Sequence, residues 1–267
     1  MRTSRLKTIA WTLSVALLTT GIASAQSSAV GQMAELISLK DKVGNADTRV
    51  RVEALHRVWS LALASGDPEL KLTAIGLLAG PIGSSSDHIR MPAVYAVVEI
   101  ANSVDDPRVK TRALGALAEP LQASQVPIRD VAIDAVNLIA RSARNGEVTL
   151  AAVRALTEPV RSGNNGVRIP AINALVRTVE GRGHVPSSQA AIDLLVSPLD
   201  SSAAIGGMEV RMMAVAALEK IGRDAQDVGT KAKAMGLLQA YAAKGSWEAE
   251  AKKRAQEGAA RIEAGAR

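Results

Sequence analysis

The sequence has no cysteine and no phenylalanine among its 267 residues, and aromatic residues make up only 2% of it. Without cysteine, disulfide bonds and thiolate metal sites are excluded. A core without phenylalanine has to be built from alanine, leucine, isoleucine and valine. Such small aliphatic side chains allow helices to approach closely, so these absences favour layers of helices held together by packing alone.

Residues that usually carry catalysis or bind metals are also sparse. His56, His88 and His184 stand far apart, and the chain has no histidine pair at i, i+4 and no His-Glu motif, which excludes the usual helical metal site. A Gly-x-Ser-x-Gly elbow is absent too, although a dispersed Ser-His-Asp triad remains open. Glu119 and Glu158 have the spacing of neighbouring carboxylates, but we favour solvated helix ends over an acid-base pair. The sequence therefore predicts no catalytic, cofactor-binding or metal-binding residues.

The first 25 residues have the pattern of a secretory signal peptide. A short basic start is followed by an apolar run over residues 9–22, and Ala23-Ser24-Ala25 forms a small-x-small cleavage signal. The run is shorter than the ~20 apolar residues that cross a bilayer, so a membrane anchor is the less favoured alternative. We expect an exported, soluble, periplasmic or extracellular protein, whose mature chain has no membrane span.

The charge does not indicate a nucleic-acid partner. The net charge is +6, but residues 1–25 hold three basic and no acidic residues, so the remainder carries +3. Nucleic-acid-binding domains concentrate a strong basic excess on one face. This mild excess is typical of ordinary solvated surface charge.

One motif, Val/Ile-Arg-x-x-Ala, recurs along the chain. Its arginines are separated by 39, 39, 39 and 43 residues, and they are Arg51, Arg90, Arg129, Arg168 and Arg211. A fixed period of this length is typical of a solenoid, in which each repeat buries its apolar face by stacking on the next. The four extra residues fall within Leu199–Gly207, which we interpret as a surface insertion rather than a binding loop.

Each repeat is predicted to contain two helices. Apolar residues lie one position before the arginine and three, seven and ten positions after it, which forms one helical stripe. Asp-Pro pairs such as Asp106-Pro107 are typical of the start of the second helix. An alanine follows 23 residues after each arginine, and seven residues later stands Pro81, Pro120, Pro159, Pro198 or, in the fifth repeat, Tyr241. The prolines predict a kink or stop near the end of the second helix.

The segments Asp47–Ala54 and Asp105–Ala113 resemble the helix starts of the HEAT-repeat family. The resemblance implies an all-α, right-handed α-solenoid of about five two-helix HEAT-like repeats, in a single domain over residues 26–267. N- and C-terminal capping helices are expected in residues 28–43 and 247–264. The repeats are expected near residues 47–86, 87–124, 125–164, 165–205 and 206–245.

In HEAT repeats, the recurrent basic residue contacts a polar group near the start of an adjacent helix. By resemblance, the five motif arginines form such a ladder, for which the candidate partners are Asp47, Asp87, Gln125, Asn165 and Glu209. The alternative is that Arg51, Arg90, Arg129, Arg168 and Arg211 bind acidic protein segments or an anionic polymer. Their place beside the buried stripe favours the ladder.

Three functions remain open because a fold does not determine a function. The favoured one is a non-catalytic scaffold that binds a protein partner and no cofactor. The others are a lyase- or hydrolase-type enzyme, or an accessory subunit of one, and a structural component of the cell envelope.

Overall fold

The structure is a computed structural model that describes residues 29–200, 207–244 and 249–265, and the regular secondary structure in these ranges is helical. A helical segment over residues 29–38 comes first. The helices that follow are α2 (Lys40–Val43), α3 (Thr48–Ala64), α4 (Pro68–Ile82), α5 (Asp87–Asn102), α6 (Pro107–Ala116), α7 (Ala118–Leu121), α8 (Val126–Ser142), α9 (Gly146–Ala155), α10 (Thr157–Arg161), α11 (Asn165–Val179), α12 (Val185–Leu194), α13 (Val196–Leu199), α14 (Gly207–Asp224), α15 (Val228–Ala243) and α16 (Ala249–Ala264). The predicted signal peptide and most of the Leu199–Gly207 insertion lie outside the described residues.

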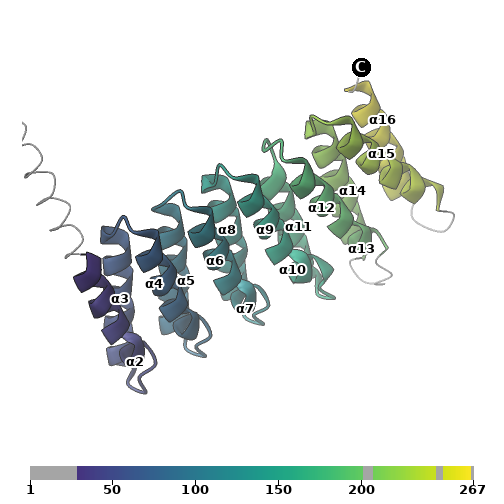
Figure 1. Cartoon of the computed structure of the whole chain (residues 1–267). Helices are drawn as coiled ribbons and strands as arrows, with labels where there is room; N and C mark the ends of the chain where they lie inside the picture. Colours follow the sequence, from purple (N-terminus) through teal and green to yellow (C-terminus); the bar gives the residue numbers. More distant parts are fainter. Residues whose placement is uncertain (1–28, 201–206, 245–248, 266–267) are drawn as a thin grey trace, which may run out of the picture.

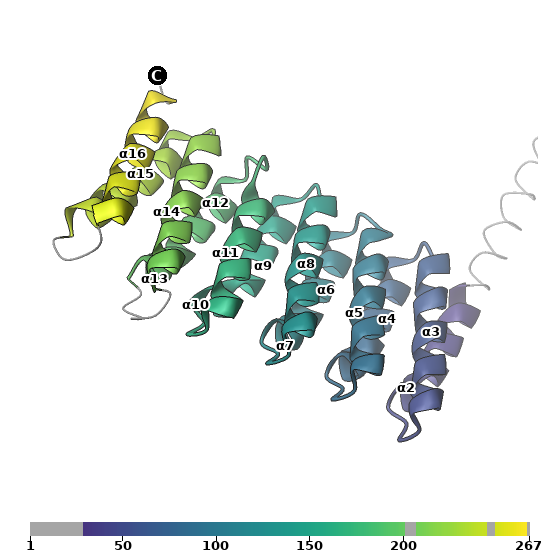
Figure 2. The ribbon, with the colours of Figure 1, turned by 180° about the vertical axis from the view of Figure 1, so that it is seen from behind.

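The helices form two parallel rows. Helices α3, α5, α8, α11 and α14 carry the arginine motifs and form the A row, which faces the viewer in Figure 2. Helices α4, α6, α9, α12 and α15 form the B row, which faces the viewer in Figure 1. One A helix and the following B helix make one repeat, so the chain is an all-α solenoid of two-helix repeats, as the sequence predicts.

Most of these helices begin at a side-chain cap. The carboxylate of Asp67 accepts the backbone N–H of Glu69 at 3.0 Å, and that of Asp106 accepts the N–H of Arg108 at 2.7 Å. In both helices proline takes the first position, where its missing N–H leaves no intrahelical hydrogen bond unmade. The Asp-Pro prediction is confirmed, and each such cap stabilises its helix by about 1 kcal/mol.

Three B helices break ahead of the repeat proline. Helices α6, α9 and α12 end four residues before Pro120, Pro159 and Pro198, and the short helices α7, α10 and α13 follow. Proline has no N–H to donate to the carbonyl oxygen four residues earlier, and its ring crowds that oxygen. The predicted kink or stop is thus confirmed in these repeats. By contrast, α4 continues through Pro81, and α15, with Tyr241 at this position, is also unbroken.

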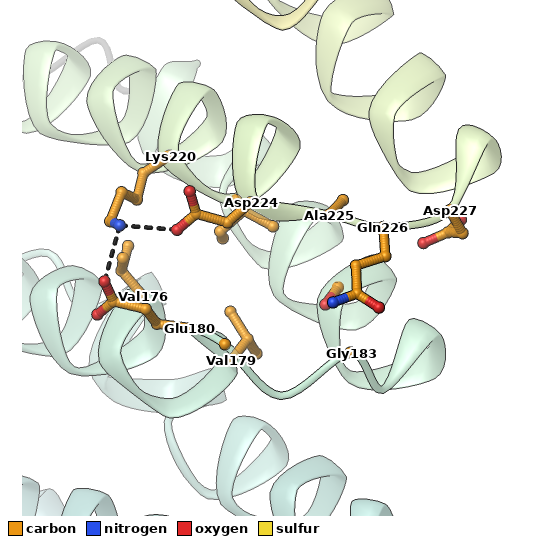
Figure 3. A pocket seen from close by; sticks show the side chains of 12 residues that line it. Val176, Val179, Glu180, Gly183, Lys220, Asp224, Ala225, Gln226 and Asp227 are labelled. Carbon is orange, nitrogen blue, oxygen red and sulfur yellow. Dashed lines mark hydrogen bonds and ion pairs between the residues drawn. The ribbon is translucent and has the colours of Figure 1, made fainter. Parts of the chain in front are cut away.

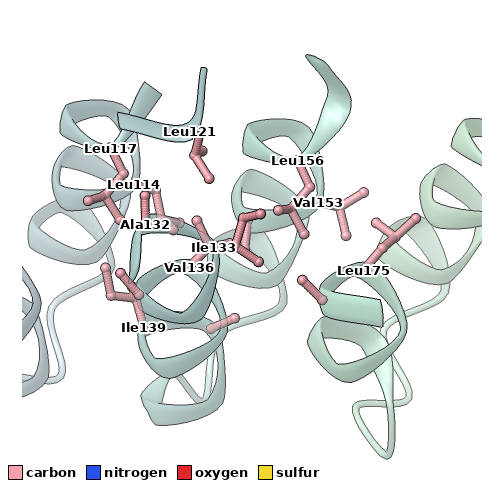
Figure 4. Packing of buried hydrophobic residues seen from close by; sticks show 14 of the residues in the cluster. Leu114, Leu117, Leu121, Ala132, Ile133, Val136, Ile139, Val153, Leu156 and Leu175 are labelled. Atoms are coloured by element: carbon pink, nitrogen blue, oxygen red, sulfur yellow. The ribbon is translucent and has the colours of Figure 1, made fainter. Parts of the chain in front are cut away.

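The hydrophobic core lies between the two rows and runs the length of the solenoid. Figure 4 shows how Ile133 of α8 and Val153 of α9 meet within it. Thr178, the polar residue of the predicted stripe, is also fully buried, and its hydroxyl donates to Asn137 Oδ1 at 3.0 Å. The recurrent alanines of the B row have no exposed surface, and they are Ala74, Ala113, Ala152, Ala191 and Ala234. A side chain this small lets the helices pack closely, as the composition predicts.

Different helices cover the two ends of the stack. The segment over residues 29–38 buries Leu36 and leaves Ile37 exposed. At the other end, α16 buries Ala251, Ala255 and Ile262 and turns its charged residues outward. Polar outer faces of this kind are expected of capping helices. Within the described part of the chain, the helices are too short or too polar to cross a membrane.

Candidate functional site

The five motif arginines lie in the first turns of the A helices. Each is the fourth residue of its helix, except Arg211, which is the fifth. Arg129, Arg168 and Arg211 are buried, with 3%, 7% and 4% of their surface exposed, while Arg51 and Arg90 are half-buried. The apolar stripe next to each arginine explains this burial, because it anchors the same face of the helix in the core.

The guanidinium groups of the central repeats contact backbone carbonyls and the next repeat. Arg129 donates to Ala123 O at 3.4 Å and to Gly166 O at 3.3 Å, so it joins the loop before its own helix to the repeat that follows. Arg168 donates to Ser162 O at 2.6 Å, and burial lowers the pKa of its guanidinium. This geometry favours a structural ladder over a row of exposed binding residues.

The expected partners of the ladder have different roles. Gln125 is one of them, and its Oε1 accepts from Arg90, the arginine of the preceding repeat, at 2.7 Å. Arg51 donates to Thr48 Oγ1 at 3.4 Å, whereas the expected Asp47 accepts a backbone N–H as the helix cap. Capping thus occupies a carboxylate oxygen of Asp47 that the ladder would use.

Two buried lysines form a second ladder that sequence reasoning missed. Lys71 is 1% exposed, and its ammonium donates to Ala62 O and Ser103 Oγ, both at 2.7 Å. Lys110, 39 residues later, is 2% exposed and donates to Ala101 O at 3.2 Å and to Ser142 Oγ at 2.8 Å. Burial lowers the pKa of both ammonium groups. The signal was present as the 39-residue spacing of the lysines and of their partners Ser103 and Ser142, but the second acceptor of each lysine is a backbone carbonyl, which a sequence does not display.

The lysine ladder is interrupted after the second repeat. The equivalent positions hold Thr149 in the third repeat and Ser188 in the fourth. In the fifth repeat the lysine returns as Lys231, which is half-buried and donates to Gly265 O at 3.3 Å. In the third repeat, Arg182 reaches back from the following loop and donates to Ala143 O at 2.8 Å, near the end of α8. A cation therefore still meets the carboxyl end of that helix, where the backbone dipole is negative.

The histidines do not assemble into a catalytic or metal-binding group. Nδ1 of His184 lies 2.6 Å from Ser187 Oγ, but Ser187 is fully buried and its hydroxyl also contacts Gly146 O at 3.4 Å. This pair sits at the start of α12, where it satisfies buried polar groups. His56 stacks on Trp59, with ring centroids 5.9 Å apart. In the described residues, no three histidine or acidic side chains come close enough to hold a metal ion.

The B row carries exposed arginines that make no ion pair with another described residue. These are Arg112 on α6 and Arg154 on the neighbouring helix α9. Arg112 borders an open, mostly apolar groove of about 610 Å³ that is also lined by Leu72 and Gly115. Arg108, at the same groove, is paired with Glu69 at 2.7 Å and with Asp106 at 3.0 Å.

No protein-family model matches the sequence, and no curated protein matches it significantly. Among solved structures, a HEAT-like repeats protein from the archaeon Thermococcus onnurineus NA1 is 14% identical, with a TM-score of 0.47, over 91% of this chain and 93% of that one. A designed armadillo repeat protein in complex with the peptide (KR)4 is 22% identical, with a TM-score of 0.46, over 85% and 99% of the two chains. Another armadillo protein, designed for modular peptide recognition, is 21% identical, with a TM-score of 0.44, over 85% and 99%. These neighbours belong to the repeat classes that the sequence resembles, and at these identities the likeness concerns the fold alone.

Proposed function

We propose that this chain is a non-catalytic scaffold that is exported and binds a protein partner along its B row. A solenoid offers a long, continuous surface on which another chain can lie. Export is supported by the signal-peptide pattern of residues 1–25. The other two functions, an enzyme or accessory subunit and a structural envelope component, rest on no particular arrangement of side chains in the described residues.

One observation carries the choice of the B row as the binding surface: the motif arginines of the A row are buried or half-buried in the stack, whereas two arginines of the B row are exposed to solvent. Arg129 and Arg168 are buried, and their guanidinium groups donate hydrogen bonds to backbone carbonyls of the solenoid. Arg112 and Arg154 are exposed and have no acidic neighbour in contact within the described part of the chain. Donors that are not satisfied internally are available to a carboxylate of a partner, with which arginine forms paired, charge-assisted hydrogen bonds.

The expected partner is an extended acidic segment with small apolar residues. Packed helices lie ~8–10 Å apart, an extended chain advances ~3.3 Å per residue, and alternate side chains share one face, so carboxylates that face arginines on adjacent B helices are expected about two or four residues apart. The apolar groove beside Arg112 lies between α4 and α6 and offers a place for an aliphatic side chain of the same segment. Charge complementarity of this kind sets specificity and association rate more than affinity.

Charge reversal tests this surface. The partner is first captured by cross-linking in living cells and identified by mass spectrometry, and its affinity is then measured with purified protein. We expect Arg112→Glu with Arg154→Glu to weaken binding at least tenfold. The matched control, Arg141→Glu with Arg177→Glu, reverses two exposed arginines of the A row and should change affinity less than twofold. Equal losses in both double variants would show that general charge, and not the B row, governs binding.

A further inference from the structure

The fourth repeat lacks the lysine that fills a fixed place in the first two. In the first repeat the place is defined by three positions: Lys71, the carbonyl of Ala62 and the hydroxyl of Ser103. Counted from the motif arginines, the equivalent residues of the fourth repeat are Ser188, Val179 and Asp224. A serine therefore occupies the position of the lysine, and a carboxylate replaces the serine whose hydroxyl accepts the lysine's hydrogen bond.

All three of these residues line one cavity. It has a volume of about 20 Å³ and lies where α11, α12 and α14 meet (Figure 3). A cavity of ~10–15 Å³ on this measure is enough to hold one water molecule. An ammonium head group is of similar size, so the cavity matches the head group of the missing lysine and not a larger ligand.

The turn that follows α11 forms the opening of the cavity, which we call its mouth. Helix α11 ends at Val179, 11 residues after its arginine, whereas α8 ends 13 residues after its own. The chain then turns through Gly181 and Gly183, whose φ angles of 67° and 62° are left-handed and favour glycine. These residues carry no side chain to cover the opening.

Ser188 supplies a hydroxyl to the lining of the cavity. Its residue surface is 9% exposed, and its hydroxyl makes no hydrogen bond to any other described residue. The hydroxyl oxygen is not fully enclosed by the protein, so a molecule in the cavity can reach it. The hydroxyl is therefore available to an occupant that offers a hydrogen bond.

The charge around the mouth favours a cation. Lys220 joins Glu180 and Asp224, with both N–O distances 2.7 Å, as the dashed lines in Figure 3 show. Arg223 lies 3.8 Å from Asp224, and Asp227 supplies a third carboxylate. Three carboxylates therefore face two cations, which leaves a formal charge of −1. The carboxyl end of α11 adds the negative end of its helix dipole, while α12 and α15 begin beside the cavity and add positive ends.

We propose that this cavity binds a primary ammonium group, which takes the place that the Lys71 and Lys110 ammonium groups occupy in the first two repeats. Its three N–H groups have three acceptors on residues that line the cavity: the Val179 carbonyl, which also accepts the N–H of Arg182 at 3.2 Å, the Ser188 hydroxyl, and the Asp224 carboxylate, which also binds Lys220. The ammonium comes either from a small free amine or from a lysine side chain of a protein partner. The aliphatic chain that bears it leaves through the glycine-lined mouth.

The test is a titration of the full-length protein with propylammonium chloride, followed by ¹H–¹⁵N NMR at the backbone amides of Gly181, Gly183 and Ala225. We expect saturable shifts at these amides, and none with tetramethylammonium chloride at equal ionic strength, because a quaternary ammonium has no N–H to donate. Ser188→Lys should abolish the shifts and raise the melting temperature, since its own ammonium would fill the cavity. Asp224→Asn should weaken binding at least tenfold, while Glu147→Gln, an exposed carboxylate on α9, should leave it unchanged.

Two results would overturn the proposal. One is that tetramethylammonium shifts the same amides to the same extent, which would reduce the effect to ionic screening. The other is that a folded Ser188→Lys protein still binds propylammonium with unchanged affinity. A peptide Ac-Gly-Lys-Gly-NH₂ separates the two sources: at least tenfold tighter binding than propylammonium supports a partner's lysine, and equal binding supports a free amine.

Discussion

Truncation of Arg129 tests whether the motif arginines hold the stack together. The side chain is 3% exposed and contacts Ala123 O in the loop before its own helix and Gly166 O in the next repeat. Arg129→Ala removes both contacts and most of the buried stem. We expect a clear loss of stability with no direct loss of partner binding, because the guanidinium does not reach the surface of the B row.

The size of the effect follows from the groups that the truncation removes. Alanine keeps Cβ, so two buried methylene groups at ~0.8 kcal/mol each contribute about 1.6 kcal/mol. The two hydrogen bonds from a charged donor are long, so together they add roughly 1 kcal/mol. The side-chain entropy that is no longer lost on folding offsets about 1 kcal/mol. The net cost is about 1–2 kcal/mol, and Arg129→Met, which keeps the aliphatic part of the side chain, should recover most of it.

Urea unfolding followed by circular dichroism at 222 nm measures this cost. The midpoint should fall for Arg129→Ala with an unchanged m-value, while the exposed control Arg112→Ala should stay within ~0.5 kcal/mol of the parent. The reasoning is refuted if Arg129→Ala is as stable as the parent and instead loses its captured partner. That result would show that the motif arginines bind the partner and do not stabilise the stack.

Three further predictions concern single side chains. Gly222→Ala should lower the melting temperature, because a Cβ there would lie 2.6 Å from Ile262 Cδ1 and 2.7 Å from Ala234 Cβ, whereas the unobstructed control Gly236→Ala should raise it. Asp106→Ala removes the cap of α6 and should lower the free energy of unfolding in urea by about 1 kcal/mol, whereas Asp106→Asn should keep most of the cap's stabilisation. Burial lowers the pKa of Lys110 below its ordinary value of 10.5, so the unfolded state binds the proton more tightly. The stability of the parent relative to Lys110→Met should therefore rise as the pH increases from the lowered pKa to 10.5, and an unchanged difference would contradict the burial effect.

The architecture was predictable because its signals are local and repeated. Asp106 before Pro107 marks a helix start, and Pro120 marks the break four residues earlier, since each acts through the backbone of its own turn. The continuation of α4 through Pro81 was not predictable in the same way. A proline in the last turn disturbs a single intrahelical hydrogen bond, and whether the helix ends there depends on the packing around it.

The direction of charged side chains was harder to predict. The stripe pattern places Arg129 at the edge of the core, but the acceptors of its guanidinium are carbonyls of a loop and of the next repeat. Lys71 and Lys110 share a repeat position, yet a charged residue is normally solvated, and its burial here depends on backbone oxygens at a helix end. Periodicity identifies such positions, and only the three-dimensional packing shows which way they face.

The junctions between A and B helices share one electrostatic condition, because the carboxyl end of each A helix is the negative end of its dipole. In the first two repeats a buried lysine meets it, and in the third Arg182 does so from the following loop. In the fourth, the cation Lys220 lies at the mouth, where two carboxylates hold it, and the buried place behind it is a cavity beside Ser188. Since a solenoid is stabilised by the sum of its nearest-neighbour interfaces, an ammonium group bound in this cavity, as we propose, would stabilise the α11–α14 junction. The regular period of the sequence therefore covers differences in side-chain chemistry between repeats that share one backbone arrangement.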